Sequence, residues 1–176
     1  MINSFDPIAK EDALLLILGS MPGKISLQTT QYYAHPRNQF WPILLTLLNQ
    51  PLTLPYKERT EKLLENRIAL WDVLQSCYRK NSLDTAIDKQ SMITNDFVRF
   101  FSNYNHIRYI VFNGITAEQI FHRQILSSLP NKAFQYQRLP STSPAHATLS
   151  YAQKLTQWSI IHSFLTHRSY ALMKSL

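Results

Sequence analysis

The residues best suited to chemistry lie in one stretch near the N-terminus. It opens with a glycine-flanked turn, Gly19-Ser-Met-Pro-Gly23, and leads to the segment Gln31-Tyr-Tyr-Ala-His-Pro-Arg-Asn38. Glycines in a turn let backbone N–H groups come close to a ligand. The second segment adds two aromatic rings, an imidazole, a guanidinium and a carboxamide. Together these groups can stack on an unstacked nucleobase and form hydrogen bonds with it.

Strands and helices that alternate along the chain must position this stretch. The apolar run Ala13-Leu-Leu-Leu-Ile-Leu18 predicts a buried strand over 13–19, because strands covered on both faces are continuously apolar. Apolar spacing predicts further strands over 67–72, 107–112 and 134–139, and helices from Asn38 to Pro51 and over 56–66, 95–101, 115–126 and 150–167. Such alternation implies a parallel sheet with helices on both faces. We therefore expect an α/β fold, a three-layer α/β/α sandwich around a four-stranded parallel sheet, as a single domain over residues 1–176.

The same topology predicts where a ligand would bind. Right-handed crossovers bring the carboxyl ends of all four strands to one rim, and ligands bind there in open α/β sheets. This rim would collect the glycine turn, Asp72, Asn113-Gly114 and the loop Ser141–His146. The loop 20–36 is long, and long loops in compact domains are usually functional. A second polar loop is expected over 78–91.

The composition favours an anionic partner. The sequence has 18 Lys and Arg against 11 Asp and Glu, a formal net charge of +7, as is typical of proteins that bind nucleic acid. The apolar run before Gly19 is much shorter than the span of about 18 residues that crosses a membrane. The lone Cys77 cannot form an internal disulfide and suits a reducing compartment. We expect a cytoplasmic monomer with no membrane partner. The histidines show no metal-ligand spacing, so neither a metal nor a cofactor is expected.

Three segments recur in an order that is typical of one family: Gly19–Gly23 with Tyr33–Trp41, then Leu70-Trp-Asp-Val73, then Leu139-Pro-Ser-Thr-Ser-Pro-Ala145. Together they resemble the uracil DNA glycosylase superfamily. The hypoxanthine-DNA glycosylase branch is the nearest resemblance, and the first segment also resembles the mismatch-specific branch. The resemblance implies that the protein flips a damaged nucleotide out of DNA into a pocket on the rim. It further implies metal-free hydrolysis of the N-glycosidic bond.

One departure from the mismatch-specific branch bears on catalysis. Relatives in that branch carry an asparagine inside the first turn that positions the attacking water. Met21 stands there in this sequence, and a thioether is only a weak acceptor. The resemblance to the hypoxanthine branch instead assigns the water to Asn38, our candidate catalytic residue. Its NH₂ group could instead donate to the base, and the purely structural alternative is that Asn38 caps the following helix, where asparagine is favoured.

The candidate base-binding residues are Gly19, Ser20, Met21, Tyr33, Asp72 and Asn113. Tyr33 would stack on the base, while Tyr32 is expected to pack beneath the loop. Backbone amides of Ser20 and Met21 would bind the base carbonyl, and Gly19 would provide space. Asp72 and Asn113 could bind a purine edge or orient water, or could instead be ordinary helix caps.

The candidate DNA-binding residues are His35, Arg37, Ser141, Ser143 and His146. His35 precedes a proline, which keeps it extended, and Arg37 could contact a phosphate. The loop from Ser141 to His146 suits a wedge that enters the minor groove. Many relatives have His-Pro-Ser or Asn-Pro-Ser in this loop, where this sequence has Ser141-Thr-Ser143. Purely structural or solvated roles are the alternatives for these residues.

Three other functions stay open from the sequence. The first is the same fold acting on uracil or thymine mispaired with guanine. The second is a DNA-binding module without catalysis, which would share the basic face and the stacking tyrosine. The third is a small-molecule nucleotide enzyme on a flavodoxin-like sheet, whose binding would not show the salt dependence of counterion release.

Overall fold

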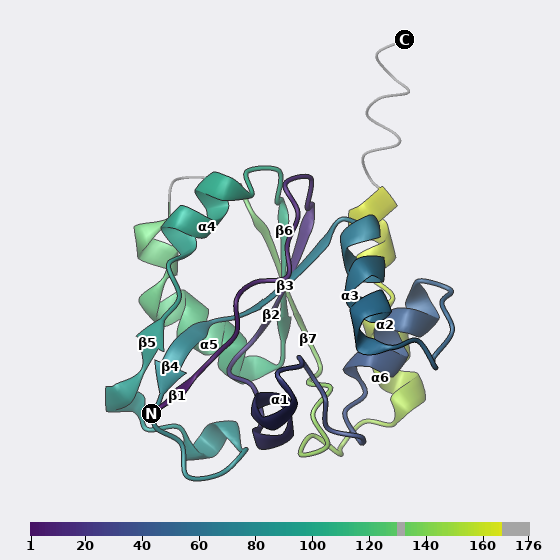
Figure 1. Ribbon diagram of the computed structural model, residues 1–176. Helices are drawn as coiled ribbons and strands as arrows, with labels where there is room; N and C mark the ends of the chain where they lie inside the picture. The colour runs from purple at the N-terminus through teal and green to yellow at the C-terminus, as the bar shows by residue number, and fades with distance from the viewer. Residues whose placement is uncertain (130–132, 167–176) are drawn as a thin grey trace.

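The computed structural model describes residues 1–129 and 133–166, and at its centre lies a parallel sheet of four strands (Figure 1). The strand order is β3-β2-β6-β7, and every neighbouring pair is parallel. The strands are β2 (Leu15–Gly19), β3 (Ile68–Asp72), β6 (Tyr109–Asn113) and β7 (Gln135–Leu139). The predicted four-stranded parallel sheet is therefore confirmed.

The strand register aligns the residues expected at the rim. Gly19 at the end of β2 lies opposite Asp72 at the end of β3. Asn113 at the end of β6 lies opposite Leu139 at the end of β7. Every residue of β2 and β3 is buried, as their continuous apolar sequences predict. The four carboxyl ends thus share one edge.

Helices cover both faces of the sheet, which confirms the three layers. In Figure 1, α4 and α5 lie on one side of the sheet and α2, α3 and α6 on the other. Their bounds are α2 Phe40–Leu47, α3 Tyr56–Glu65, α4 Phe97–Asn103, α5 Ile115–Gln124 and α6 Tyr151–Trp158. The helix predicted over 150–167 is interrupted by a turn at 159–160, and helical turns resume over 161–166. Residue 167 lies outside the described residues.

Several elements were not predicted. A small antiparallel sheet, in the order β1-β4-β5, is formed by β1 (Ile2–Asn3), β4 (Leu74–Cys77) and β5 (Ile93–Thr94). These strands are too short to show a clear alternation. The predicted loop 20–36 contains α1 (Lys24–Thr29), and the polar loop 78–91 contains two 3₁₀ turns, Asp84–Ala86 and Lys89–Ser91.

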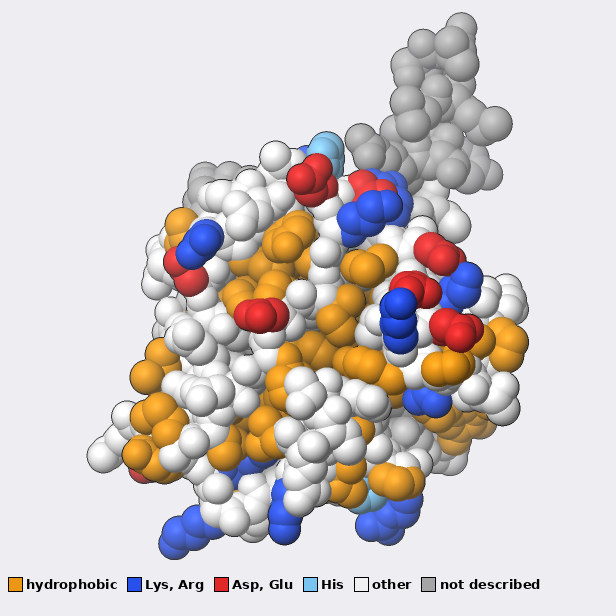
Figure 2. Space-filling view, in the orientation of Figure 1, with side chains coloured by type: hydrophobic (Ala, Val, Ile, Leu, Met, Phe, Trp, Pro, Cys, Tyr) orange, Lys and Arg blue, Asp and Glu red, His pale blue; other side chains and the backbone are white. Residues whose placement is uncertain are grey.

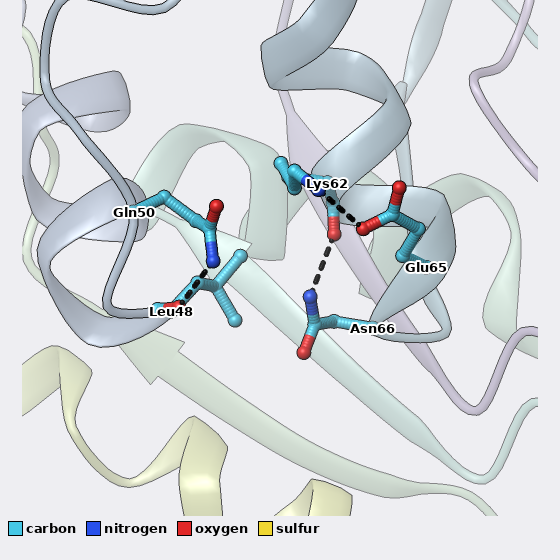
Figure 3. A network of polar contacts seen from close by, with 5 residues as sticks. All are labelled: Leu48, Gln50, Lys62, Glu65 and Asn66. Carbon is cyan, nitrogen blue, oxygen red and sulfur yellow. Dashed lines mark hydrogen bonds and ion pairs between the residues drawn. The ribbon is translucent and has the colours of Figure 1, made fainter.

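Polar contacts fix the end of α3 just before β3 begins, at the end of β3 that lies opposite the rim (Figure 3). Asn66 Nδ2 donates to the Lys62 carbonyl at 2.8 Å, and Lys62 Nζ lies 2.7 Å from Glu65 Oε2. A similar side-chain to backbone bond follows α2, where Gln50 Nε2 donates to the Leu48 carbonyl at 3.1 Å. Among the described residues, no helix has the length and apolarity that a membrane span requires.

Candidate active site

Gly19 lies at the centre of the rim. Other groups occupy the space that a side chain would need at this position. A Cβ built on Gly19 would overlap Asp72 Oδ1 and would lie 2.8 Å from the Tyr33 hydroxyl oxygen. The end of β2, the end of β3 and the loop after the glycine turn therefore meet at one point. This close approach is the physical reason for a glycine here.

Tyr33 is held in an unusual conformation over that point. Its φ is +56°, in the left-handed region that non-glycine residues seldom adopt. One face of its ring stacks on Phe40, with 3.9 Å between ring centroids. Its hydroxyl is buried and has no hydrogen-bond partner among the described residues. Burial raises the Tyr33 pKa far above its ordinary value, the Asp72 charge adds to this, and the Asn113 amide opposes it. The hydroxyl is therefore a neutral donor.

Asp72 is buried beside the Tyr33 hydroxyl and bonded to the N-terminal segment. Its Oδ2 accepts from Ser4 Oγ at 2.6 Å. Burial raises the pKa of Asp72 to about 7; the Ser4 hydrogen bond lowers it, the Asp84 charge raises it and Arg79 lowers it. Asp72 can thus be either an acceptor or a donor near neutral pH. The expectation that it caps a helix is wrong, since Asp72 is followed by strand β4.

Asn113 connects β6 to the loop after β7. Its Nδ2 donates to Thr142 Oγ1 at 2.9 Å, and its Oδ1 accepts from the Thr142 backbone N–H at 2.9 Å. Asn113 makes no capping bond to α5, whose N-cap is Gly114 without a side-chain bond. The cap alternative is wrong for this residue as well. Thr142 is fully buried, and its carbonyl accepts from the Gln39 N–H at 3.0 Å. Its part in the rim was not foreseen.

Asn38 is half-buried just before α2. Its Oδ1 accepts from the Phe40 N–H, at the first residue of α2, at 2.9 Å. The N-cap of α2 is Gln39, without a side-chain bond, so Asn38 precedes the cap and the cap alternative is wrong. An amide oxygen has two lone pairs, and the bond from the Phe40 N–H uses one of them. The Asn38 NH₂ group makes no hydrogen bond to another described residue. The carboxamide therefore keeps both an acceptor and a donor for a ligand.

A segment that the sequence left as a plain polar loop lies on the glycine turn. Ser20 Oγ donates to Asp84 Oδ1 at 2.8 Å, and the Lys24 N–H donates to Ser82 Oγ at 3.0 Å. Arg79 donates to the Met21 carbonyl at 3.5 Å, and also to the Pro22 carbonyl. Asp84 and Arg79 lie some 60 residues from their partners in the sequence, so no local pattern could have revealed these contacts.

Tyr32 packs beneath the loop, as expected. It is 3% exposed, and its carbonyl accepts from Trp41 Nε1 at 2.8 Å. Burial raises the Tyr32 pKa well above its ordinary value. Only one of the two adjacent tyrosine side chains, Tyr33, therefore reaches the centre of the rim.

The candidate DNA-binding residues border the rim. Arg37 is exposed, whereas His35, Ser141, Ser143 and His146 are half-buried. The serines form tight turns: Ser141 Oγ accepts from the Ser143 N–H, and Ser143 Oγ accepts from the Ala145 N–H, both at 3.2 Å. Buried Lys154 holds this loop from behind, donating to the His146 carbonyl at 2.7 Å. Figure 2 shows Lys and Arg side chains along the lower edge, where Figure 1 places α1 and the loop after β7.

In the part of the chain that is described, no three His, Cys, Asp or Glu residues cluster as a metal site would require.

The comparisons with known proteins agree with this geometry. Residues 6–163 match the family model of the uracil DNA glycosylase superfamily. A relative from Methanosarcina acetivorans, named hypoxanthine DNA glycosylase, is 30% identical over 160 residues, which cover 90% of this chain and 96% of the relative. A relative of the same name from Methanosarcina barkeri is 36% identical over 113 residues, 64% of this chain and 70% of that protein.

A solved structure shares the fold. It is a solution NMR structure of a Methanosarcina acetivorans protein assigned as a candidate uracil DNA glycosylase, with a TM-score of 0.77 and 28% sequence identity. The match covers 93% of this chain and 97% of that protein. Because the family model spans almost all of the chain and its motifs meet at one rim, the chain belongs to the uracil DNA glycosylase superfamily, and the expected class of enzyme, a DNA glycosylase, is confirmed.

Proposed function

We propose that the protein removes hypoxanthine from DNA by hydrolysing the N-glycosidic bond of deoxyinosine. The names of the two Methanosarcina relatives support this substrate. The structural observation that carries the proposal is the buried, unpaired hydroxyl of Tyr33 beside Asp72. A buried hydroxyl without a partner costs about 1–3 kcal/mol, a cost that a bound base could offset. Hypoxanthine offers both a carbonyl oxygen and an N–H on one edge, which match the donors and acceptors gathered there.

In the proposed reaction, negative charge develops on the departing base and positive charge on the sugar. Donors fixed in advance near the base lower the barrier most, and the backbone N–H groups of Ser20 and Met21 are suited to this. Asn38 Oδ1 would accept a hydrogen bond from the attacking water with its second lone pair. Its bond from the Phe40 N–H fixes the direction of that oxygen. The helix contact and the catalytic role are therefore compatible.

The first experiment is cleavage of labelled duplexes that contain hypoxanthine, uracil or xanthine, followed by alkali treatment of abasic sites. We expect the fastest release from deoxyinosine. Release of uracil alone would contradict the proposed substrate. Uracil in a mismatch is the second candidate because uracil presents a similar carbonyl and N–H edge, and because the matched NMR structure is described as that of a candidate uracil DNA glycosylase.

Variants of Asn38 test its catalytic role. Asn38→Ala removes the acceptor for water together with the bond from the Phe40 N–H, whereas Asn38→Asp keeps oxygens that can serve both. We expect Asn38→Ala to lower the single-turnover rate at least about 100-fold and the stability by about 0.5–1.5 kcal/mol. Asn38→Asp should retain stability and more of the rate than Asn38→Ala. Unchanged cleavage by Asn38→Ala would remove the proposed water-positioning role.

The partner of the rim is proposed to be duplex DNA, contacted by His35, Arg37, Ser141, Ser143 and His146. Arg37, whose side chain is exposed, is the clearest candidate for a phosphate contact. Its replacement by Ala should weaken binding to all sequences and reduce the salt slope by about 1. We further propose that the protein acts as a single-domain monomer in the cytoplasm; the buried thiol of Cys77 is consistent with a reducing compartment.

A further inference from the structure

The first four carbonyl groups of the glycine turn, those of residues 19–22, all bond to one neighbouring segment. Backbone N–H groups of Val73 and Leu74 donate to the carbonyls of Gly19 and Ser20 at 2.9 and 3.1 Å. The Arg79 guanidinium donates to the next two carbonyls, those of Met21 and Pro22. Four successive carbonyls of the turn therefore bond to residues of 73–79.

This arrangement fixes the direction of the opposite N–H groups. In a trans peptide the C=O and N–H bonds point in opposite directions. The Ser20 N–H shares a peptide with the Gly19 carbonyl, and the Met21 N–H shares one with the Ser20 carbonyl. Both N–H groups must then point away from β4, and neither donates to another described residue. The structure thus presents two adjacent, unused donors at the rim, in line with the need for donors near a departing base.

Strand β4 alone orients only the first half of the turn. The Met21–Pro22 bond has no N–H, because proline lacks one, so the second half depends on its carbonyl contacts. Arg79 supplies these, since its planar fork can reach two acceptors at once. Asp84 adds a third contact by accepting from Ser20 Oγ at 2.8 Å. Arg79 also lies near the carboxylates of Asp72 and Asp84; burial raises the pKa of each, and the Arg79 charge opposes that rise.

We propose that Arg79, supported by Asp84, is a positioning residue that holds the glycine turn so that the Ser20 and Met21 N–H groups face the base. Neither residue need touch the substrate. This inference rests on the proposed function, and it names residues that act through the turn. It explains why the 79–84 segment contacts the turn at two separate points, through Arg79 and Asp84.

A direct phosphate contact is the competing explanation for Arg79. Lys24, Arg79 and Lys80 line a cavity of about 540 Å³ beside the turn, so the guanidinium is close to other cations. The two roles differ in what they change. A phosphate contact contributes to binding and to its salt dependence, whereas a misdirected turn slows bond cleavage after the DNA has bound.

The test compares Arg79→Met with Lys80→Met, which removes the same charge from the neighbouring residue. With saturating enzyme and the base that the wild type releases fastest, we expect Arg79→Met to lower the single-turnover rate on the order of 100-fold. Affinity for abasic duplex and its salt slope should change no more than in Lys80→Met, and Lys80→Met should retain the wild-type rate. Arg79→Lys should recover only part of the rate, because an ammonium cannot form the fork. Equal rates for the two Met variants, or a loss of affinity alone, would overturn the proposal.

A second readout does not depend on activity. ¹⁵N relaxation of the free protein should give ordered Ser20 and Met21 amides in the wild type, with S² about 0.85, and lower values in Arg79→Met. Asp84→Ala should cause a smaller loss of order, and Asp88→Ala, which loses only a contact within its own loop to the Gln90 N–H, should cause none. Unchanged order in Arg79→Met would refute the positioning role. If the wild type released no base at all, the proposed function would be wrong, but the relaxation measurement would still test whether Arg79 orders the turn.

Discussion

The Tyr33 hydroxyl lies directly over Gly19, 2.8 Å from the point where a Cβ of that glycine would be. This contact joins the end of β2 to a loop 14 residues further along the chain. It brings a stacking ring, a buried carboxylate and the free N–H groups of the glycine turn to one position at the rim.

The first prediction concerns that contact. Gly19→Ala introduces a methyl group that overlaps Asp72 Oδ1 and crowds Tyr33. Overpacking of this kind costs about 1–3 kcal/mol, and the displaced Tyr33 should reduce cleavage strongly. Gly23→Ala is the matched control, since nothing lies within 4 Å of its added Cβ. Urea unfolding and single-turnover assays check both, and equal behaviour of the two variants would contradict the close approach.

The second prediction separates stability from activity at Tyr33. Tyr33→Phe removes a buried hydroxyl that has no partner, so the free energy of unfolding should stay the same or rise by about 1 kcal/mol. Cleavage of deoxyinosine should fall, because the proposed hydrogen bond between the hydroxyl and the base is lost. In Tyr32→Phe, by contrast, weak bonds to the Phe5 and Asp6 carbonyls are lost, and activity should persist. A marked loss of stability in Tyr33→Phe would show that the hydroxyl is paired in solution.

The third prediction is a pH dependence of stability from Asp72. Burial raises its pKa to about 7 in the folded protein, so between about pH 4 and pH 7 the folded state binds more protons than the unfolded state. Its contribution to stability should therefore fall as pH rises through this window, by up to about 1.4 kcal/mol per pH unit. Urea unfolding at several pH values measures it. Asp72→Asn should flatten the fall, although Asp84, whose pKa is also raised by burial, will retain part of it.

The fourth prediction concerns the bond pair between Asn113 and Thr142. Thr142→Val keeps the shape but removes the fully buried Thr142 hydroxyl that accepts from Asn113 Nδ2, which should cost about 1–3 kcal/mol. The loop from Ser141 to His146 should also become less ordered, and affinity for abasic duplex should fall. Thr148→Val is the control, because that hydroxyl is exposed and its one side-chain contact, to His146 Nε2, is long at 3.4 Å. Equal unfolding free energies for the two variants would argue against the buried pair.

Local sequence patterns were enough to predict the layers and the rim. Continuous apolar runs such as 13–18 mark strands buried on both faces, and the helical spacing between them implies a parallel sheet. The short strands β1, β4 and β5 and the helix α1 escaped prediction. Their periodicity covers too few residues, and their pairing depends on contacts between distant segments such as Ile2 and Cys77.

The sequence by itself determined which residue types gather at the carboxyl edge, since parallel strands place their ends together whatever the side-chain details. Only the tertiary structure decided how these groups are used. It placed the Tyr33 hydroxyl in a buried position without a partner. It paired Asp72 with Ser4 and Asn113 with Thr142. It also brought Arg79 and Asp84 into contact with the glycine turn. Each of these contacts joins segments far apart in the chain, so it is set by packing of the whole fold and leaves no signal in local periodicity.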